Sequence, residues 1–275
     1  MAGLARYTAV LRLFSQSQSE WTVPDMAERL GVPQSTVYRT VRDLVGENFL
    51  EMASEARYRL GSVFIEFDRM LRLTDPLLTA GSQVLQEVVA EAGVPCVGLL
   101  CRLYNDTVMC IADATAPGAT FRSSYERGRP MPLTLGATSK AILAHLPTRR
   151  FNRIVNQWPE ARSGAFRAEL LAVRRSGVCV SSGEIDADVV GVAAPILSKA
   201  PGLLASLSLV LPQGLADKAM VARIAAATMA GAKRIEAGVE AVALREALIE
   251  GEESGPAVAI DSAAFLSRMR AKHVR

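Results

Sequence analysis

The stretch V-P-D-M-A-E-R-L-G-V-P-Q-S-T-V-Y-R-T-V-R-D-L-V, residues 23–45, decides the fold of the first part of the chain. Pro24 to Leu30 predicts a short helix that ends at Gly31. Pro33 then redirects the chain, and a second helix is expected to begin near Gln34. Two helices joined by a short turn that contains glycine form the geometry that places a helix in the major groove of DNA.

The second predicted helix has one apolar face and one polar face. Its apolar stripe, at roughly helical spacing, consists of Val37, Val41, Leu44 and Phe49. We expect DNA contacts from Gln34, Ser35, Thr36, Tyr38, Arg39 and Arg42. Arginine donors fit a phosphate or the edge of guanine, and unpaired N–H groups in a first helical turn attract a phosphate. The alternative is an ordinary solvated helix in which Arg39 pairs with Asp43.

A hairpin, or wing, is predicted directly after this helix, over residues 50–60. Apolar residues at 50 and 52 indicate the first strand, and those at 58 and 60 indicate the second. Arg57 and Arg59 flank Tyr58, so both are expected on one side, where they would lie along a sugar-phosphate backbone. The alternative is a solvent-exposed hairpin without DNA contacts.

The charge of this region is balanced rather than basic. Residues 1–75 contain nine arginines, no lysine and ten acidic residues, and the whole chain has a formal net charge of +3. A basic domain is the usual electrostatic signature of DNA binding. We therefore expect binding to depend on individually placed arginines, with modest non-specific affinity and few phosphate contacts.

The composition is that of a globular, core-forming protein without a membrane span. The 275 residues suffice for two domains, and 50% of them are hydrophobic. No apolar run reaches about 18 residues, and the start lacks a secretory signal pattern. The four cysteines, Cys96, Cys101, Cys110 and Cys179, form no metal-ligand pattern. Reduced, buried thiols in a cytoplasmic protein are expected, with no cofactor and no metal.

We expect an α+β protein with four parts. Residues 1–61 form a winged helix-turn-helix domain whose first helix covers 7–16, and residues 62–75 form a linker helix. Residues 76–250 form a second domain, and residues 251–275 form a tail that begins as a linker and ends as a candidate basic helix. The linker helix has a wide apolar stripe, which is expected to meet another subunit or, alternatively, to pack on its own domains. That stripe consists of Val63, Phe64, Phe67, Met70 and Leu71.

The second domain combines helices with an antiparallel set of strands. Helices are predicted over 77–92, 136–145, 166–176 and 216–250. Strands are predicted over 95–103, 106–112, 178–181, 188–196 and 203–211, with a further candidate strand over 121–125. Helices before and after such strands indicate a domain in which helices pack on a sheet.

The first sixty residues resemble the DNA-binding domain of IclR-type bacterial transcription regulators, whose recognition helix carries a Ser-Thr-Val-x-Arg core, here residues 35–39. The second half resembles that family's GAF-like effector domain at three places. These are R-P-M-P-L-T-L-G-A-T-S-K-A-I-L-A (129–144), S-G-V-C-V-S-S-G-E-I-D-A-D-V-V-G-V-A-A-P-I (176–196) and L-A-S-L-S-L-V-L-P (204–212). The resemblance extends to about residue 245. It departs at Ser139 and Asp188, where the family usually or often has glycine, and at Gly191, where relatives often carry cysteine or serine.

An effector site is expected at the start of the helix that follows Leu135. Small residues there leave N–H groups and the helix dipole free to favour a carboxylate. The resemblance implies an effector site lined by Ala137, Thr138, Ser181, Gly191 and Ser208. Ser139 adds a hydroxyl donor, and Ser182, Glu184 and Asp188 lie on the adjoining loop. The alternatives are helix capping by Thr138 and Ser139, and a solvated loop or an ion pair for Glu184 and Asp188.

These features predict a DNA-binding transcriptional regulator whose effector is a small organic or aromatic acid. No Gly-x-Ser-x-Gly elbow, phosphate loop, dinucleotide fingerprint or metal motif occurs, and His145 has no obvious catalytic partner, so an enzyme is not expected. We expect a homodimer that presents two recognition helices to a pseudo-palindromic operator in double-stranded DNA. The resemblance implies further pairing into a dimer of dimers. The alternative is a DNA-binding repressor that responds to no ligand.

Overall fold

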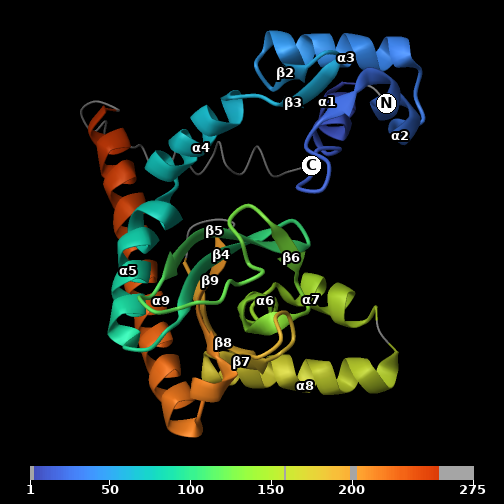
Figure 1. Cartoon of the computed structure of the whole chain (residues 1–275). Coiled ribbons are helices and arrows are strands. Elements are labelled where there is room, and N and C mark those ends of the chain that lie inside the picture. Colours follow the sequence, from blue (N-terminus) through green and yellow to red (C-terminus); the bar gives the residue numbers. More distant parts are fainter. Residues whose placement is uncertain (1–2, 158, 199–202, 254–275) are drawn as a thin grey trace, which may run out of the picture. The chain divides into compact units, whose positions relative to one another are not determined.

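The computed structural model describes residues 3–157, 159–198 and 203–253, and Figure 1 shows the order of the elements. The chain divides into two compact units, Met1–Asp75 and Pro76–Arg275. Both units combine helices with an antiparallel sheet. The chain is therefore α+β, as the sequence predicts.

The first unit is built from four helices and a three-stranded sheet. Its helices are α1 (Leu4–Leu11), α2 (Val23–Leu30), α3 (Gln34–Gly46) and α4 (Val63–Thr74). Its strands, β1 (Trp21–Thr22), β2 (Leu50–Ser54) and β3 (Arg57–Leu60), pair in the order β1-β3-β2. The core includes Met26 from α2 and Val37, Val41 and Leu44 from α3. The arrangement is a helix-turn-helix followed by a wing.

Local signals explain this unit. The Thr22 hydroxyl accepts a hydrogen bond from the Asp25 N–H and so caps α2, while Gly31, with φ of 65°, ends it in the left-handed conformation. The predicted turn, second helix and hairpin are confirmed. Phe49 does not belong to the helical stripe, because α3 ends at Gly46; its ring packs instead on Phe64, with centroids 5.6 Å apart.

Two other expectations for this unit fail. The first helix covers Leu4–Leu11 rather than 7–16, because a tight turn closed by reciprocal backbone hydrogen bonds between Ser15 and Gln18 follows it. Strand β1 was not predicted, since two residues carry no readable alternation.

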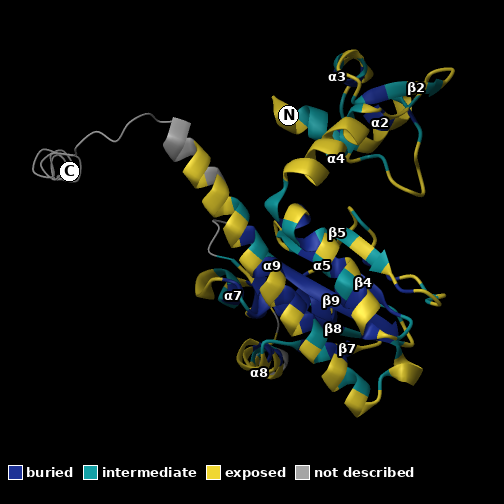
Figure 2. Cartoon of the chain, turned by 90° about the vertical axis from the view of Figure 1, so that its left-hand side faces the viewer, coloured by how far each residue is buried: buried dark blue, intermediate teal, exposed yellow. Residues whose placement is uncertain are grey.

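The second unit is centred on a six-stranded sheet in the order β6-β5-β4-β9-β8-β7, with every neighbouring pair antiparallel. The strands are β4 (Val97–Tyr104), β5 (Thr107–Thr115), β6 (Pro130–Pro132), β7 (Cys179–Ser182), β8 (Val189–Leu197) and β9 (Leu204–Pro212). The strands β9 and β8 are almost wholly buried, as the dark blue ribbon in Figure 2 shows. Both faces of this sheet are therefore covered.

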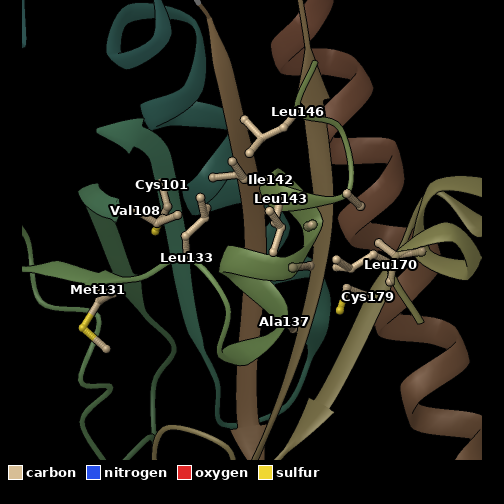
Figure 3. Packing of buried hydrophobic residues seen from close by; sticks show 14 of the residues in the cluster. Cys101, Val108, Met131, Leu133, Ala137, Ile142, Leu143, Leu146, Leu170 and Cys179 are labelled. Carbon is tan, nitrogen blue, oxygen red and sulfur yellow. The ribbon is translucent and has the colours of Figure 1, made fainter. Parts of the chain in front are cut away.

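Two helices cover one face and three others lie on the opposite face (Figure 1). The first two are α5 (Pro76–Ala92) and α9 (Lys218–Glu253), and a short 3-10 helix, Gln213–Leu215, precedes α9. The other three are α6 (Gly136–Leu143), α7 (Thr148–Val155) and α8 (Glu160–Ser176). Figure 3 shows the second face, where residues of α6 such as Ile142 and Leu143 lie close to Cys101 and Val108 of the sheet. Glycine permits the closest approach on the first face: a Cβ on Gly98 would lie 2.3 Å from Val89 Cγ2.

The predicted strands and helices of this unit are present, with shifted ends and three exceptions. Helix α8 begins at Glu160 instead of 166, and neither α7 nor β6 was predicted. The candidate strand over 121–125 is wrong, because the Ser124 N–H donates to the Asp186 carboxylate instead of to a neighbouring strand. Helix α9 continues to Glu253 and includes the start of the predicted tail; residues 254–275 lie outside the described residues.

Candidate DNA-binding surface and effector site

The outward face of α3 carries the side chains predicted to contact DNA. Five of these residues are exposed, namely Gln34, Ser35, Tyr38, Arg39 and Arg42. The exposed fraction of Tyr38 is 57%. The opposite face is fixed in the core by Val37, Val41 and Leu44. The amphipathic pattern of α3 thus directs two arginines and an aromatic ring away from the domain.

The two arginines of α3 differ in their surroundings. Asp43 accepts hydrogen bonds from the Tyr7 hydroxyl at 3.0 Å and from Arg42 at 3.3 Å. The hydrogen bond from Tyr7, helped by Arg42, holds the pKa of Asp43 below its usual value. The alternative pairing of Arg39 with Asp43 is therefore not formed. Among the described residues, Arg39 has no hydrogen-bond or ion-pair partner.

Other members of the predicted set are less available. Thr36 is half-buried beside α1, and its N–H donates to the Pro33 carbonyl at 2.9 Å, so this group is not a free anchor for phosphate. In the wing, Arg59 Nε lies 2.7 Å from Glu51 Oε1 of the facing strand. Arg57 is exposed and, within the described part of the chain, has no such partner.

In the second unit, the N-terminus of α6 faces a small cavity of about 30 Å³. The Gly136 N–H donates to Glu184 Oε2 at 2.9 Å, and the Ala137 N–H donates to Ser181 Oγ at 2.8 Å. Five of the predicted effector residues line this cavity: Ala137, Thr138, Ser181, Glu184 and Gly191. The cavity is about the size of one water molecule, and the N–H groups of Gly136 and Ala137 already have acceptors.

The remaining predicted effector residues are not on the cavity wall. Ser208 is buried in β9, where it accepts a hydrogen bond from the Thr138 hydroxyl at 3.0 Å. The Ser139 hydroxyl lies 2.9 Å from the Tyr125 hydroxyl. Ser182 and Asp188 are exposed. Since Thr138 and Ser139 bond elsewhere, the alternative in which they cap α6 is also wrong; Glu184 and Ser181 perform that role.

A buried lysine connects this site to α8. The Lys140 side chain is only 6% exposed, and its Nζ lies 2.6 Å from Glu184 Oε1 and 2.7 Å from Glu169 Oε1. Burial by itself lowers the pKa of Lys140, but the two carboxylates outweigh burial and the pKa is raised. Glu184 therefore forms the ion pair that the sequence left as an alternative.

The structure adds residues that the sequence did not indicate. Ser123, Tyr125, Ile185, Asp186, Val189 and Val210 also line the small cavity. The Asp186 carboxylate accepts hydrogen bonds from both the N–H and the hydroxyl of Ser124. Burial raises the pKa of Tyr125, whose hydroxyl donates to the Leu135 carbonyl at 3.1 Å. The contacts between Ser124 and Asp186 join positions 62 residues apart, and no motif marks them.

A larger hollow of about 310 Å³ lies beside the small cavity and shares Ser123 and Tyr125 with it. Its walls are the paired strands β4 and β5, at Val97, Leu99, Asp113 and Thr115, and the segment 121–127. Its volume is at the lower end of the range for small-molecule sites. Among the described residues, no His, Cys, Asp or Glu side chains form a metal-binding group.

The two units match known domains in the order in which they occur. Residues 3–53 match the model of the IclR helix-turn-helix domain, and residues 76–237 match that of the bacterial transcriptional regulator IclR C-terminal domain. Together they define a DNA-binding transcriptional regulator rather than an enzyme. The chain belongs to the IclR family.

Individual relatives agree with this assignment. The chain is 25% identical over 209 residues to the HTH-type transcriptional regulator KipR of Bacillus subtilis, covering 73% of this chain and 82% of KipR. The crystal structure of an IclR transcriptional regulator from Alicyclobacillus acidocaldarius matches with a TM-score of 0.73 at 24% identity, over 86% of this chain and all of that one (100%). An IclR homolog from Microbacterium hydrocarbonoxydans, crystallised with 4-hydroxybenzoate, matches with a TM-score of 0.71 at 23% identity, over 86% and 99%.

None of the helices in the described part of the chain combines the length and hydropathy needed to cross a bilayer. His145 Nδ1 lies 2.9 Å from the Ala141 carbonyl at the end of α6. All four cysteines are free and buried, as predicted.

Proposed function

We propose that this regulator binds a pseudo-palindromic operator and that a small organic or aromatic acid, bound in the second unit, modulates this binding. The observation that chiefly supports an effector is the hollow of about 310 Å³, which shares Ser123 and Tyr125 with the small cavity at the N-terminus of α6. Val97, Leu99 and Phe121 supply apolar walls for a ring, while the α6 N-terminus favours a carboxylate. The 4-hydroxybenzoate bound by the Microbacterium protein belongs to this chemical class.

The proposed DNA contacts come from the exposed face of α3 and from the wing. Arg39 is the residue assigned to a base edge, because it is exposed and, among the described residues, unpaired. Gln34, Ser35 and Tyr38 flank it, and Arg57 is assigned to the phosphate backbone. Arg42 and Arg59 contribute less, since each already has a carboxylate partner.

A homodimer is proposed because a symmetric operator requires two copies of α3. Helix α4 supports this proposal: none of its residues is buried, and Ile65 is 74% exposed. Phe64 and Phe67 contact Phe49, so part of the apolar stripe packs within the first unit and the rest is available to a second copy. Pairing of the second units would give the dimer of dimers. DNA binding and four free thiols fit a cytoplasmic location.

The experiment combines operator binding with ligand addition. An operator selected from random DNA is labelled, and its anisotropy is titrated with the full chain, with and without aromatic and aliphatic acids. Benzoate or a related acid is expected to change the dissociation constant, whereas its neutral amide is not. Sedimentation at the same concentrations gives the oligomeric state.

A second candidate function is a DNA-binding repressor without a ligand. One observation favours it: Glu184 and Ser181 already cap the α6 N–H groups, and the cavity between them is about 30 Å³. Melting curves separate the two functions, because a ligand that binds only the folded state raises the melting temperature by mass action. Unchanged melting temperatures across the whole acid panel favour the second candidate.

A further inference from the structure

Glu184 lies between two hollows and holds two positively polarised groups. It follows Gly183 in the loop between β7 and β8, and its side chain is 29% exposed. It lines the small cavity on one side and, on the other, a groove of about 350 Å³ whose walls include Phe166 and Leu135. A side chain in this position controls access to the N-terminus of α6.

The two oxygens of Glu184 have different partners. Oε2 accepts from the Gly136 N–H at 2.9 Å, and Oε1 accepts from Lys140 Nζ at 2.6 Å. The ammonium is buried and lies one helical turn after the Gly136 N–H, so a backbone donor and a full positive charge converge on a single carboxylate. An incoming carboxylate would need the same Gly136 N–H.

Lys140 does not depend on Glu184 alone. Glu169 on α8 lies 2.7 Å from the same Nζ, so the buried ammonium keeps a counter-charge when Glu184 moves. Glu184 can also release Gly136 through Oε2 while Oε1 remains on Lys140. Glu184 can therefore leave Gly136 and remain paired with Lys140, and in that position no buried charge is left without a partner.

We propose that Glu184 is an internal competitor for acid ligands: its carboxylate occupies the Gly136 N–H, and an acid enters the effector site only by displacing it. This inference rests on the effector site of the proposed function. Because Glu184 is tethered, it competes at a high effective concentration, of the order of millimolar or above. Small anions that offer only a charge are therefore excluded, and a ligand needs an organic body that makes further contacts to replace Glu184.

Two glutamates of the same cluster provide a matched test. Glu184→Ala removes the competitor, whereas Glu169→Ala removes the other partner of Lys140 and leaves Gly136 capped. Benzoate and neutral benzamide are titrated into isotope-labelled full-length protein, and the amide resonances of Gly136 and Ala137 are followed. Glu184→Ala is expected to bind benzoate about tenfold or more tightly than wild type, with shifts centred on these two amides. Glu169→Ala is expected to bind benzoate with the same affinity as wild type. The affinity for benzamide is expected to be the same in wild type and in both variants.

Equal benzoate affinity in wild type and Glu184→Ala overturns the proposal, and so does weaker binding in the variant, which would make Glu184 part of the binding surface. If Glu184→Ala does not fold, Glu184→Gln decides: its neutral amide is a poorer acceptor for Gly136 N–H, so a gain of about threefold or more supports competition, and no gain refutes it. The proposed function fails separately, when benzoate binds Glu184→Ala at Gly136 but no acid alters operator binding in any variant.

Discussion

Replacing Arg39 by alanine is the most direct test of the DNA-binding surface. The Arg39 side chain is exposed and, within the described residues, makes no hydrogen bond or ion pair, so its removal breaks nothing inside the domain. The free energy of unfolding is therefore expected to change by less than about 0.5 kcal/mol. Any loss of operator binding then reports a contact with DNA.

The expected loss depends on what Arg39 touches. A bidentate contact to guanine contributes about 1–3 kcal/mol of discrimination, which is roughly a 5- to 150-fold change in the dissociation constant. A phosphate contact weakens all sequences about equally and lowers the slope of log affinity against log salt by about 1. Anisotropy titrations with operator and scrambled DNA at several salt concentrations separate the two contacts.

Arg42 supplies the matched comparison. It lies on the same face but has Asp43 at 3.3 Å, which the Tyr7 hydroxyl holds in place. Its contact with DNA competes with an exposed ion pair worth up to about 1 kcal/mol, so Arg42→Ala is expected to lose less affinity than Arg39→Ala. Arg223→Ala, on α9, controls for net charge. If Arg39→Ala binds operator and scrambled DNA as wild type does, the assignment of this face to DNA is refuted.

Three further outcomes are expected. Lys140→Met removes the cation that pairs with Glu169 and Glu184, so it should lower the free energy of unfolding of the second unit by about 2–3 kcal/mol in urea titrations. Adding Glu184→Gln and Glu169→Gln to this variant should recover part of the lost stability. Burial lowers the pKa of His145, so the unfolded chain binds the extra proton as pH falls below about 6.5; wild type should lose stability between pH 7.5 and 5.5, and His145→Asn should lose less. Burial raises the pKa of the Cys96 thiol to about 11 and of the Cys179 thiol to about 12, so a thiol reagent should label the native chain slowly and all four cysteines in denaturant.

What the sequence predicts well are features determined by neighbouring residues. Gly31 and Pro33 mark the turn of the helix-turn-helix. Glycine readily adopts the left-handed conformation that ends α2, and proline has no N–H with which to continue a preceding helix. The apolar runs in 188–196 and 203–211 similarly predict β8 and β9 to within one residue. The segment 121–125 forms no pairs in the sheet, because the Ser124 N–H donates to Asp186, and the prediction of a strand there is wrong.

The contacts around the start of α6 were predicted only in part for the same reason. The start of α6 follows from its small residues, but the acceptors of its N–H groups come from a loop more than forty residues later. Glu184 was assigned to the loop without its partner, and the hydrogen bonds between Ser124 and Asp186 join positions with no common motif. Thr138 and Ser139 are of residue types that often cap helices. In the structure, the Thr138 hydroxyl instead donates to Ser208 of β9, and the Ser139 hydroxyl lies within hydrogen-bond distance of the Tyr125 hydroxyl.

The proposed competition at Gly136 also limits where selectivity for an effector can arise. When a ligand carboxylate replaces that of Glu184, the Gly136 N–H keeps one charged acceptor, so this exchange adds little net free energy. A tenfold effect on operator binding nevertheless requires about 1.4 kcal/mol of differential affinity between two arrangements of the protein. At roughly 25 cal/mol per Å², burial of about 60 Å² of apolar ligand surface supplies that amount. The hollow offers such surface at Leu99 of β4, whose neighbour Leu100 packs on the opposite face against Gly81 of α5. Strand β4 therefore contacts both the site proposed for the ligand body and α5, the helix that begins directly after the first unit.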